Sequence, residues 1–260
     1  MKMPDKETCP IFDINVHLGC WHNQRLPYTS PLQLQKKLNS LGIRKAFVSS
    51  NQAIFYSDPE PGNLELLNKV KRYPLFVPVP VFNPNIPNSE EILRKYSKLK
   101  IKIIKLFPSF HNYSLNSEKI KSVLKFCLLE GFIILIQMRM EDERLQHPTL
   151  KTNPLDIDKI LEIAEMYPSL PIICLSGYFN ECVRLAQNSS NIYLDISFAE
   201  RLDTIKALLD VIPLSRIVFG SHTPFFYPES ALLKVESSEI PLCWKEHILY
   251  KNIETLMEER

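Results

Sequence analysis

Residues 11–19 read Ile-Phe-Asp-Ile-Asn-Val-His-Leu-Gly and predict a buried strand that ends in polar side chains. Alternation along a strand places Asp13, Asn15 and His17 on one face and the apolar residues between them on the other. An edge strand with one solvated face would show the same alternation. Because this stretch opens a long series of strand and helix patterns, we favour a strand that ends in a functional site.

Seven further strand patterns follow, and helical patterns alternate with them. The strands are expected at residues 44–50, 75–82, 101–107, 132–138, 171–175, 191–195 and 216–221. The helices are expected at residues 30–42, 62–72, 89–99, 117–130, 157–164, 179–187, 200–210 and 242–258. Pro78 and Pro80 remove hydrogen-bond donors from the third strand, so we expect that strand to be frayed or bulged.

This alternation predicts an α/β fold with a parallel sheet. The apolar run 132–136 is typical of a strand that is buried on both faces. Eight strand–helix units in 260 residues, without a linker, favour a single (β/α)8 TIM barrel over an open sheet. We expect one TIM-barrel domain over residues 1–260, with the barrel at about 11–236 and a C-terminal helix at about 242–258.

Composition and charge exclude several classes of function. The formal net charge of +2 gives no electrostatic case for binding nucleic acid or an anionic membrane. No apolar run approaches the roughly 20 residues that span a bilayer, and the first residues lack the apolar stretch of a secretory signal. The six cysteines are scattered, with no pair at metal-ligand spacing, which is typical of reduced thiols. We therefore expect a cytoplasmic protein.

In a TIM barrel, the working residues sit at the C-terminal ends of the strands. The predicted strand ends carry Asn15, His17, Lys105, Gln137, Ser176, Asp195, Ser197 and His222. Trp21 and His22 follow the first strand and could line the same mouth. The loop 137–148 carries charges of both signs, and it is either a solvated loop or part of the site.

The sequences around these ends are specific enough to compare with a known family. They are Phe-Asp-Ile-Asn-Val-His-Leu-Gly, Ile-Ile-Lys-Leu-Phe-Pro, Ile-Leu-Ile-Gln-Met, Ile-Ile-Cys-Leu-Ser-Gly, Ile-Tyr-Leu-Asp-Ile-Ser and Ile-Val-Phe-Gly-Ser-His-Thr-Pro-Phe. Together they resemble the amidohydrolase superfamily, in its amidohydrolase-related branch (amidohydrolase 2), which includes aminocarboxymuconate-semialdehyde decarboxylase. The resemblance runs from about Ile11 to Leu256.

The resemblance implies a metal site whose ligands are mostly replaced. In that branch a His-x-His on the first strand and a histidine on the fifth hold a divalent metal, usually zinc. Some members add a histidine on the sixth strand, and an aspartate ends the eighth. Here only His17 matches, whereas Asn15, Gln137, Ser176 and His222 stand at the other positions. We therefore expect no cofactor and no tight metal, and a loosely bound divalent metal such as zinc stays open.

The resemblance also implies a function, in two alternatives. One is a hydrolase or lyase of a small carboxylate-bearing molecule, working at a degenerate metal site. The other is a catalytically inactive pseudoenzyme used as an anion-binding or scaffold protein. The expected catalytic residues are His17, His222 and Lys105, and the expected substrate-binding residues are Asn15, Gln137, Arg139, Ser176, Asp195, Arg144 and His147.

Charge at the strand ends suggests the partner. His17, Lys105, Arg139 and His222 would face Asp195 as the only expected carboxylate. Such a pocket would hold a small anionic molecule, and its binding would weaken as rising pH removes charge from the imidazoles. The alternative for Lys105 is an ion pair with Asp195 or Asp13. A homodimer is left open.

Overall fold

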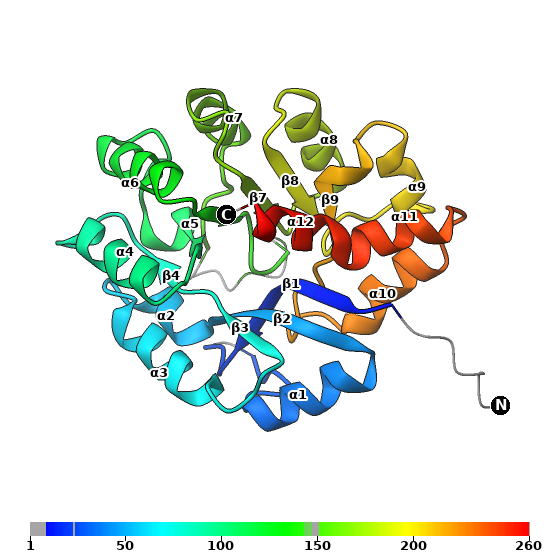
Figure 1. Ribbon diagram of the computed structural model, residues 1–260, viewed down its shortest axis with the longest axis horizontal. Helices are drawn as coiled ribbons and strands as arrows, with labels where there is room; N and C mark the ends of the chain where they lie inside the picture. Colours follow the sequence, from blue (N-terminus) through cyan, green and yellow to red (C-terminus); the bar gives the residue numbers. More distant parts are fainter. Residues whose placement is uncertain (1–8, 23, 143, 145, 147–150, 260) are drawn as a thin grey trace.

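Parallel strands form the centre of the computed structural model and helices surround them (Figure 1), in the described residues 9–22, 24–142, 144, 146 and 151–259. The strands are β1 (Ile11–Leu18), β2 (Ile43–Ser50), β3 (Phe76–Pro78), β4 (Val81–Phe82), β5 (Ile103–Leu106), β6 (Ile133–Gln137), β7 (Ile172–Leu175), β8 (Ile192–Asp195) and β9 (Ile217–Val218).

Helices follow the strands along the chain. They are α1 (Pro31–Ser40), α2 (Asn51–Phe55), α3 (Glu60–Val70), α4 (Ser89–Lys98), α5 (Pro108–His111), α6 (Glu118–Leu129), α7 (Ile157–Met166), α8 (Phe179–Gln187), α9 (Thr204–Leu209), η2 (Leu214–Arg216), α10 (Pro228–Glu236), α11 (Leu242–Glu246), η3 (His247–Lys251) and α12 (Asn252–Glu258). The short helices α2 and α5 follow strand ends directly and were not predicted. Among the described residues, no helix has the length and apolar character to cross a membrane.

The strands pair in sequence order but belong to two sheets, β1-β2-β3 and β4-β5-β6-β7-β8-β9. The division between β3 and β4 falls at Pro78 and Pro80, as expected for a strand that has lost donors. The two residues between them are bonded one to each sheet, because Val79 N donates to Val48 O of β2 at 2.8 Å and Lys105 N of β5 donates to Pro80 O at 2.9 Å. The third predicted strand is therefore two short strands.

A second seam separates β1 from the end of β9. Ile14 N donates to Phe219 O at 3.0 Å, and His17 N donates to Thr223 O at 2.8 Å. These bonds run between the first and last strands of the chain without forming a continuous ladder. Each seam thus joins the two sheets through a few backbone hydrogen bonds.

The predicted alternation along β1 is wrong at one point. The register with β2 shifts between Asp13 and Val16, so β1 carries an extra residue there. Ile14 packs in the cluster inside the barrel, whereas Val16 packs in the cluster under the outer helices. The extra residue lets Asn15 point inwards directly after Ile14, above the apolar interior.

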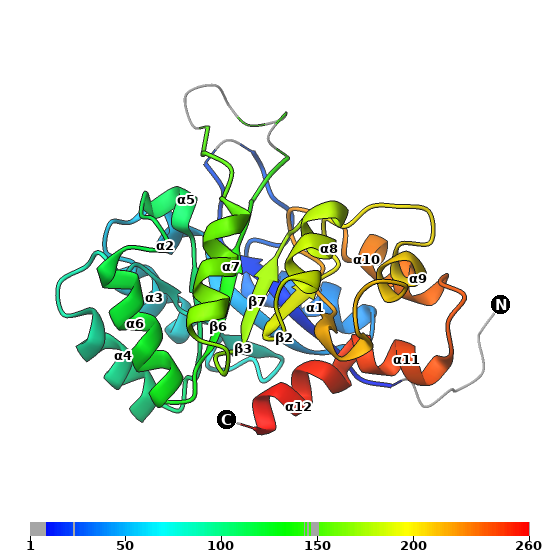
Figure 2. The ribbon, with the colours of Figure 1, turned by 90° about the horizontal axis from the view of Figure 1, so that it is seen from above.

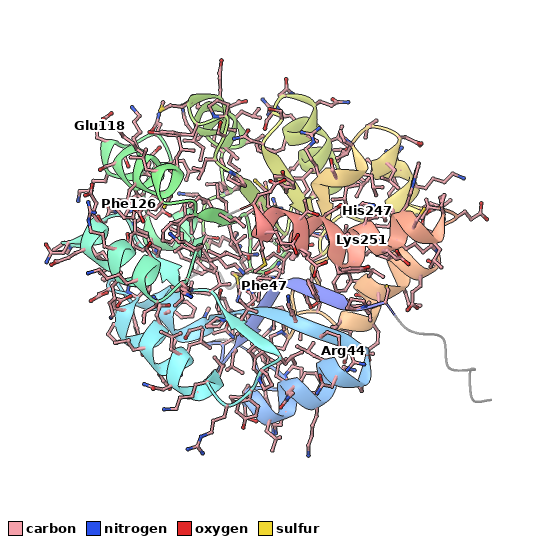
Figure 3. All side chains as sticks on the ribbon, viewed as in Figure 1. Arg44, Phe47, Glu118, Phe126, His247 and Lys251 are labelled. Carbon is pink, nitrogen blue, oxygen red and sulfur yellow. The ribbon has the colours of Figure 1, made fainter. Side chains whose placement is uncertain are left out.

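Two apolar layers enclose the strands. The outer layer lies between strands and helices, and it includes the predicted stripe of α6, with Ile120, Val123 and Leu124 buried. Charged side chains such as Arg44 and Glu118 lie on the outside, whereas Phe47 points into the barrel (Figure 3).

The C-terminal helix closes one end of the barrel. Ile253 and Leu256 of α12 join the interior cluster with Phe12 and Ile14. Figure 2 shows α12 on the side of the molecule opposite α5, which follows the C-terminal end of β5. Asn252 Nδ2 fixes the start of the helix by donating to Ile217 O at 2.8 Å. The C-terminal ends of the strands therefore lie at the opposite end of the barrel, which α12 leaves uncovered.

Ile253→Ala should lower the free energy of unfolding by about 2–5 kcal/mol, because it leaves a cavity under the closed end of the barrel. Leu242→Ala in the same segment removes a side chain that is 71% exposed and should change it by less than about 0.5 kcal/mol. Urea denaturation followed by circular dichroism measures both. Equal effects of the two variants would mean that α12 does not close the barrel core.

Candidate functional site

The predicted strand-end residues meet above the apolar interior in one buried polar cluster, the mouth cluster. Its members are all at most 3% exposed: Asn15, His17, Lys105, Gln137, Ser176, Asp195, Ser197 and His222. Buried polar groups need hydrogen-bond partners, because each unpaired one loses its interactions with water. The cluster's geometry is therefore set by how these side chains satisfy one another.

Asn15 links four strands through its side-chain amide. Its Nδ2 donates to Asp195 Oδ2 at 2.9 Å and to Ser176 Oγ at 3.1 Å. Its Oδ1 accepts a hydrogen bond from Lys105 Nζ at 2.9 Å. Both ends of the amide are used, which fixes its orientation.

Lys105 is buried at the end of β5 and donates from Nζ to Asn15 Oδ1, and its Nζ lies 3.0 Å from His17 Nε2. No carboxylate lies within ion-pair distance of it in the described part of the chain. Burial lowers the pKa of Lys105 to about 7, although the carboxylates of Asp195 and Asp13 oppose this shift. The alternative of a direct ion pair between Lys105 and Asp195 or Asp13 is therefore wrong.

His17 is held between Lys105 and an aromatic wall. Its Nε2 lies 3.0 Å from Lys105 Nζ and 3.2 Å from Asn15 Oδ1, so it accepts from the amine when the ring proton is on Nδ1 and donates to the amide when the proton is on Nε2. Burial, and then the charges of Lys105 and His222, keep the pKa of His17 well below its usual value. The Asn51 side chain acts in the opposite direction, yet His17 Nδ1 has no hydrogen-bond partner within the described residues. The imidazole is therefore not a cation.

His222 is also neutral. Its Nε2 donates to Met140 O at 2.8 Å, which leaves Nδ1 as an acceptor 3.4 Å from Ser176 Oγ. Burial lowers its pKa to about 3. The ring stacks on Phe225, with centroids 5.0 Å apart. The expected loss of anion binding as the imidazoles lose charge therefore has no basis, since neither His17 nor His222 carries that charge at neutral pH.

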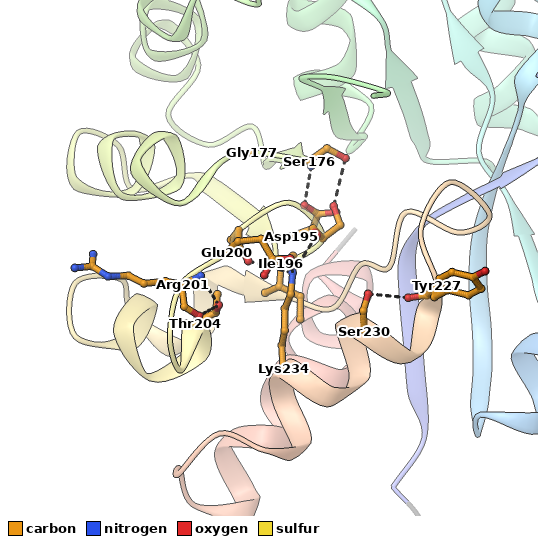
Figure 4. Close-up of polar contacts among 12 residues, drawn as sticks. Ser176, Gly177, Asp195, Ile196, Glu200, Arg201, Thr204, Tyr227, Ser230 and Lys234 are labelled. Atoms are coloured by element: carbon orange, nitrogen blue, oxygen red, sulfur yellow. Dashed lines mark hydrogen bonds and ion pairs between the residues drawn. The ribbon is translucent and has the colours of Figure 1, made fainter. Parts of the chain in front are cut away.

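Asp195 accepts a hydrogen bond from Ser176 N at 2.7 Å (Figure 4). It also accepts hydrogen bonds from Ser197 Oγ and from Asn15 Nδ2, each at 2.9 Å. Burial raises its pKa and these hydrogen bonds oppose the rise. The carboxylate also needs a glycine beside it. A Cβ at Gly220 would lie 2.5 Å from Asp195 Oδ2, so no other residue fits there without a shift.

Arg139 does not point a free guanidinium into the cluster. It donates to Ser176 O, and its NH2 group lies 2.7 Å from Glu181 Oε1 in an ion pair. Its guanidinium also lies over the ring of Tyr178, 3.8 Å from the centroid. Gln137 stands next to it and donates to Arg139 O at 2.6 Å. The side chains of Arg139 and Gln137 therefore hold the mouth cluster in place and do not extend towards a ligand.

Asp13 is a member of the site that sequence reasoning gave no role beyond an ion pair. Its Oδ1 accepts a hydrogen bond from Ser221 N at 2.9 Å, and its Oδ2 accepts one from Ser221 Oγ. Burial raises the pKa of Asp13 to about 7. Asp195 is therefore not the only carboxylate near Lys105. The sequence could have indicated this role, since Asp13 precedes Asn15 and His17 on the same strand.

Aromatic rings cover the mouth cluster. The Phe225 ring packs edge-on against His17, at 5.5 Å, and Trp21 packs against Phe225 at 4.9 Å. Trp21 Nε1 donates to Glu141 Oε1 at 2.9 Å, which ties the first loop to the loop after β6. The expectation that Trp21 lies at the mouth agrees with this position.

An open cavity of about 690 Å³ lies beside this cover, and we call it the side cavity. It is lined by Asp142, Arg144, Tyr178, Phe179, Asn180, Phe198, Glu200, Arg201 and Phe226. Phe198 and Phe226 also contact His222, at centroid distances of 5.3 and 5.6 Å. These two rings therefore form the wall between the side cavity and the mouth cluster.

The charges of the side cavity are partly paired. Arg144 binds both carboxylate oxygens of Asp142, at 2.9 and 2.6 Å. Glu200 pairs with Lys234 at 2.6 Å. Arg201 stacks on Phe179, 4.9 Å from the centroid, and has no carboxylate partner within the described residues. Of the predicted substrate-binding residues only Arg144 lines this cavity, and His147 lies outside the described residues.

Lys234 on α10 shapes the cavity wall from behind. Its Nζ donates to Ile196 O, Ser197 O and Ala199 O, each at 3.1 Å (Figure 4). These bonds hold the segment after β8, which carries Phe198 and the charged pair Glu200 and Arg201. Sequence reasoning missed Lys234, because only the folded chain brings α10 to this loop.

The sequence matches no protein-family model and has no significant match among curated proteins. Among solved structures, 5-carboxyvanillate decarboxylase from Sphingomonas paucimobilis has a TM-score of 0.73 and 11% identity, covering 96% of this chain and 99% of that chain. A TIM-barrel protein from Bordetella bronchiseptica has a TM-score of 0.73 and 16% identity, with the same coverage of 96% and 99%.

A third similar structure is dihydroxybenzoic acid decarboxylase from Polaromonas sp. JS666 with bound manganese and the inhibitor 2-nitroresorcinol. Its TM-score is 0.66 and its identity 16%, covering 86% of this chain and 85% of that chain. The likenesses confirm the predicted TIM-barrel fold. They also agree with the resemblance to the amidohydrolase-related branch, at the level of the fold.

The residues present do not fit a divalent metal at the position the resemblance implies. Asn15, Gln137 and Ser176 offer amides and a hydroxyl, which are weak ligands compared with imidazole or carboxylate. The ring nitrogens of His222 are engaged by Met140 O and Ser176 Oγ. No group of at least three histidine, cysteine, aspartate or glutamate side chains that could hold a metal ion occurs among the described residues.

Lys105→Met should change how stability depends on pH. Burial holds the pKa of Lys105 at about 7 in the folded chain, whereas an unfolded lysine titrates near 10.4. Between these values the unfolded chain binds more protons, so Lys105 makes the wild type more stable as pH rises. The free energy of unfolding of wild type minus that of Lys105→Met should therefore rise by up to about 1.4 kcal/mol per pH unit.

Urea denaturation from about pH 7 to about pH 10 measures this difference. Lys102→Met is the matched control, since Lys102 lies three residues earlier with its side chain 30% exposed. The control difference should stay nearly flat. A flat difference for Lys105→Met as well would mean that the Lys105 amine keeps its ordinary pKa in the fold.

Proposed function

We propose that this chain binds a small aromatic carboxylate in the side cavity and does not convert it by metal chemistry. This is the pseudoenzyme alternative, in its anion-binding form. The observation that carries it is the contrast between two neighbouring regions. The mouth cluster is buried and internally bonded, whereas the side cavity beside it is open, aromatic and holds a cation.

The chemistry of the side cavity favours such a ligand. Tyr178, Phe198 and Phe226 offer ring faces and edges to an aromatic molecule. Arg201 can donate two parallel hydrogen bonds to a carboxylate, and its stacking on Phe179 already orders the side chain. The volume of about 690 Å³ is in the range of small-molecule sites. Decarboxylases of aromatic carboxylates among the similar structures support the ligand class.

A metal-free lyase is the second candidate, and one observation favours it. A buried lysine whose pKa is lowered to about 7 is typical of catalytic sites. In this candidate His17, His222 and Lys105 supply acid and base groups, and a ligand reaches them when Phe198 and Phe226 move aside. The two candidates share the ligand class and differ in whether the ligand is consumed.

Calorimetric titration tests the binding. Benzoate and 2,6-dihydroxybenzoate should bind, whereas benzamide, which lacks the charge, should bind more weakly. Arg201→Gln should weaken benzoate binding by about 1 kcal/mol, roughly fivefold in Kd, because the guanidinium is partly solvated. Arg44→Gln, at an exposed position on β2, is the control and should bind as the wild type does.

Incubation of the same ligands separates the two candidates. The binding protein leaves 2,6-dihydroxybenzoate unchanged, with or without manganese, as followed by chromatography. Conversion without metal that is lost in Lys105→Met would establish the lyase instead. Benzoate binding that is no stronger than benzamide binding, or that ignores Arg201, would overturn the assignment of the side cavity.

A further inference from the structure

The amine of Lys105 lies where two first-strand side chains converge. Nζ is 2.9 Å from Asn15 Oδ1 and 3.0 Å from His17 Nε2. These two residues stand at the positions that the resemblance assigns to the His-x-His metal ligands. The two atoms that would face a metal ion at that position therefore face the nitrogen of a lysine.

The side chains around this amine are oriented by their own hydrogen bonds. Asn15 Oδ1 accepts a hydrogen bond from it, and His17 Nε2 lies beside both atoms, 3.0 Å from the amine and 3.2 Å from the amide oxygen. Asn15 is held in this orientation, since its Nδ2 is already committed to Asp195 and Ser176. A flipped amide would place donors against the amine and lose these bonds.

We propose that Lys105 is an internal replacement for the metal ion: its side chain occupies the metal position and prevents a divalent cation from binding there. A lone pair that accepts an N–H bond cannot at the same time coordinate a metal. The chain thus keeps a lysine amine at the centre of the mouth cluster while giving up the chemistry of an exchangeable metal. This inference concerns the mouth cluster alone and does not depend on the ligand proposed for the side cavity.

The proposal makes a specific claim about metal binding. Restoring the ligands with Asn15→His, Gln137→His and His222→Asp is not sufficient, because Lys105 still fills the position. Adding Lys105→Ala to these three changes frees it. We therefore expect the fourfold variant to bind zinc or cobalt at about one equivalent, at least about 100-fold more tightly than the threefold variant, which exceeds the usual effect of neighbours outside the ligand shell.

The measurements are calorimetric titration with zinc and the visible absorption of cobalt, which reports the ligand geometry. The wild type, purified without chelator, should carry no stoichiometric metal by elemental analysis. Threefold and fourfold variants that bind zinc equally tightly would overturn the proposal. So would one equivalent of metal in the wild type, because Lys105 would then not exclude it.

A second experiment needs only one substitution and so does not depend on the engineered site folding. Lys105→Ala removes a propylammonium-sized piece from the cluster. Added propylammonium chloride should raise the thermal midpoint of this variant above that in equal sodium chloride. Lys102→Ala and the wild type, which keep the cluster filled, should show no such difference. Absence of rescue in Lys105→Ala would mean that the position does not select a cation, and the proposal would fall.

Discussion

The cost of burying polar groups is the constraint on which this structure depends. The strand ends bring amides, hydroxyls, imidazoles, a carboxylate and an amine into a space that aromatic rings shield from water. The groups there are bonded largely to one another, and Asn15 supplies three of these hydrogen bonds by joining β1 to β5, β7 and β8. The same requirement explains the neutral histidines, since burial, and then the neighbouring charge of Lys105, lowers the pKa of both His17 and His222. Local chemistry and barrel stability are therefore decided by one network.

The order of strands and helices could be predicted from the sequence because parallel strands buried on both faces leave long apolar runs and short connections. The strand-end residues could be found for the same reason, since the fold fixes which end of each strand meets the others. Their interactions could not be found that way. Whether the Lys105 amine bonds to a carboxylate or to an amide depends on differences of about an ångström in position. The extra residue in β1 that turns Asn15 inwards cannot be detected in the pattern of hydrophobic residues.

The open cavity of the structure does not lie over the strand-end residues on which the family resemblance rests. The mouth cluster is covered by Phe225 and Trp21, and the open volume lies to one side, over the segment held by Lys234. Phe198 and Phe226 belong to both regions, because one side of each ring faces the side cavity and the other contacts His222. A molecule in the side cavity would therefore press on the cluster through two rings without touching its polar atoms.

The seam at Pro78 and Pro80 has a consequence for how the chain folds and opens. A continuous barrel wall unfolds as a unit, since removing one strand breaks ladders on both sides. Here the three-stranded sheet is joined to the six-stranded sheet by only a few backbone hydrogen bonds at each seam. The first 80 or so residues form a segment with its own strand pairing, and opening along both seams leaves the ladders within each sheet intact. In amide hydrogen exchange this segment would act as a separate cooperative unit, released before the core of β5, β6 and β7.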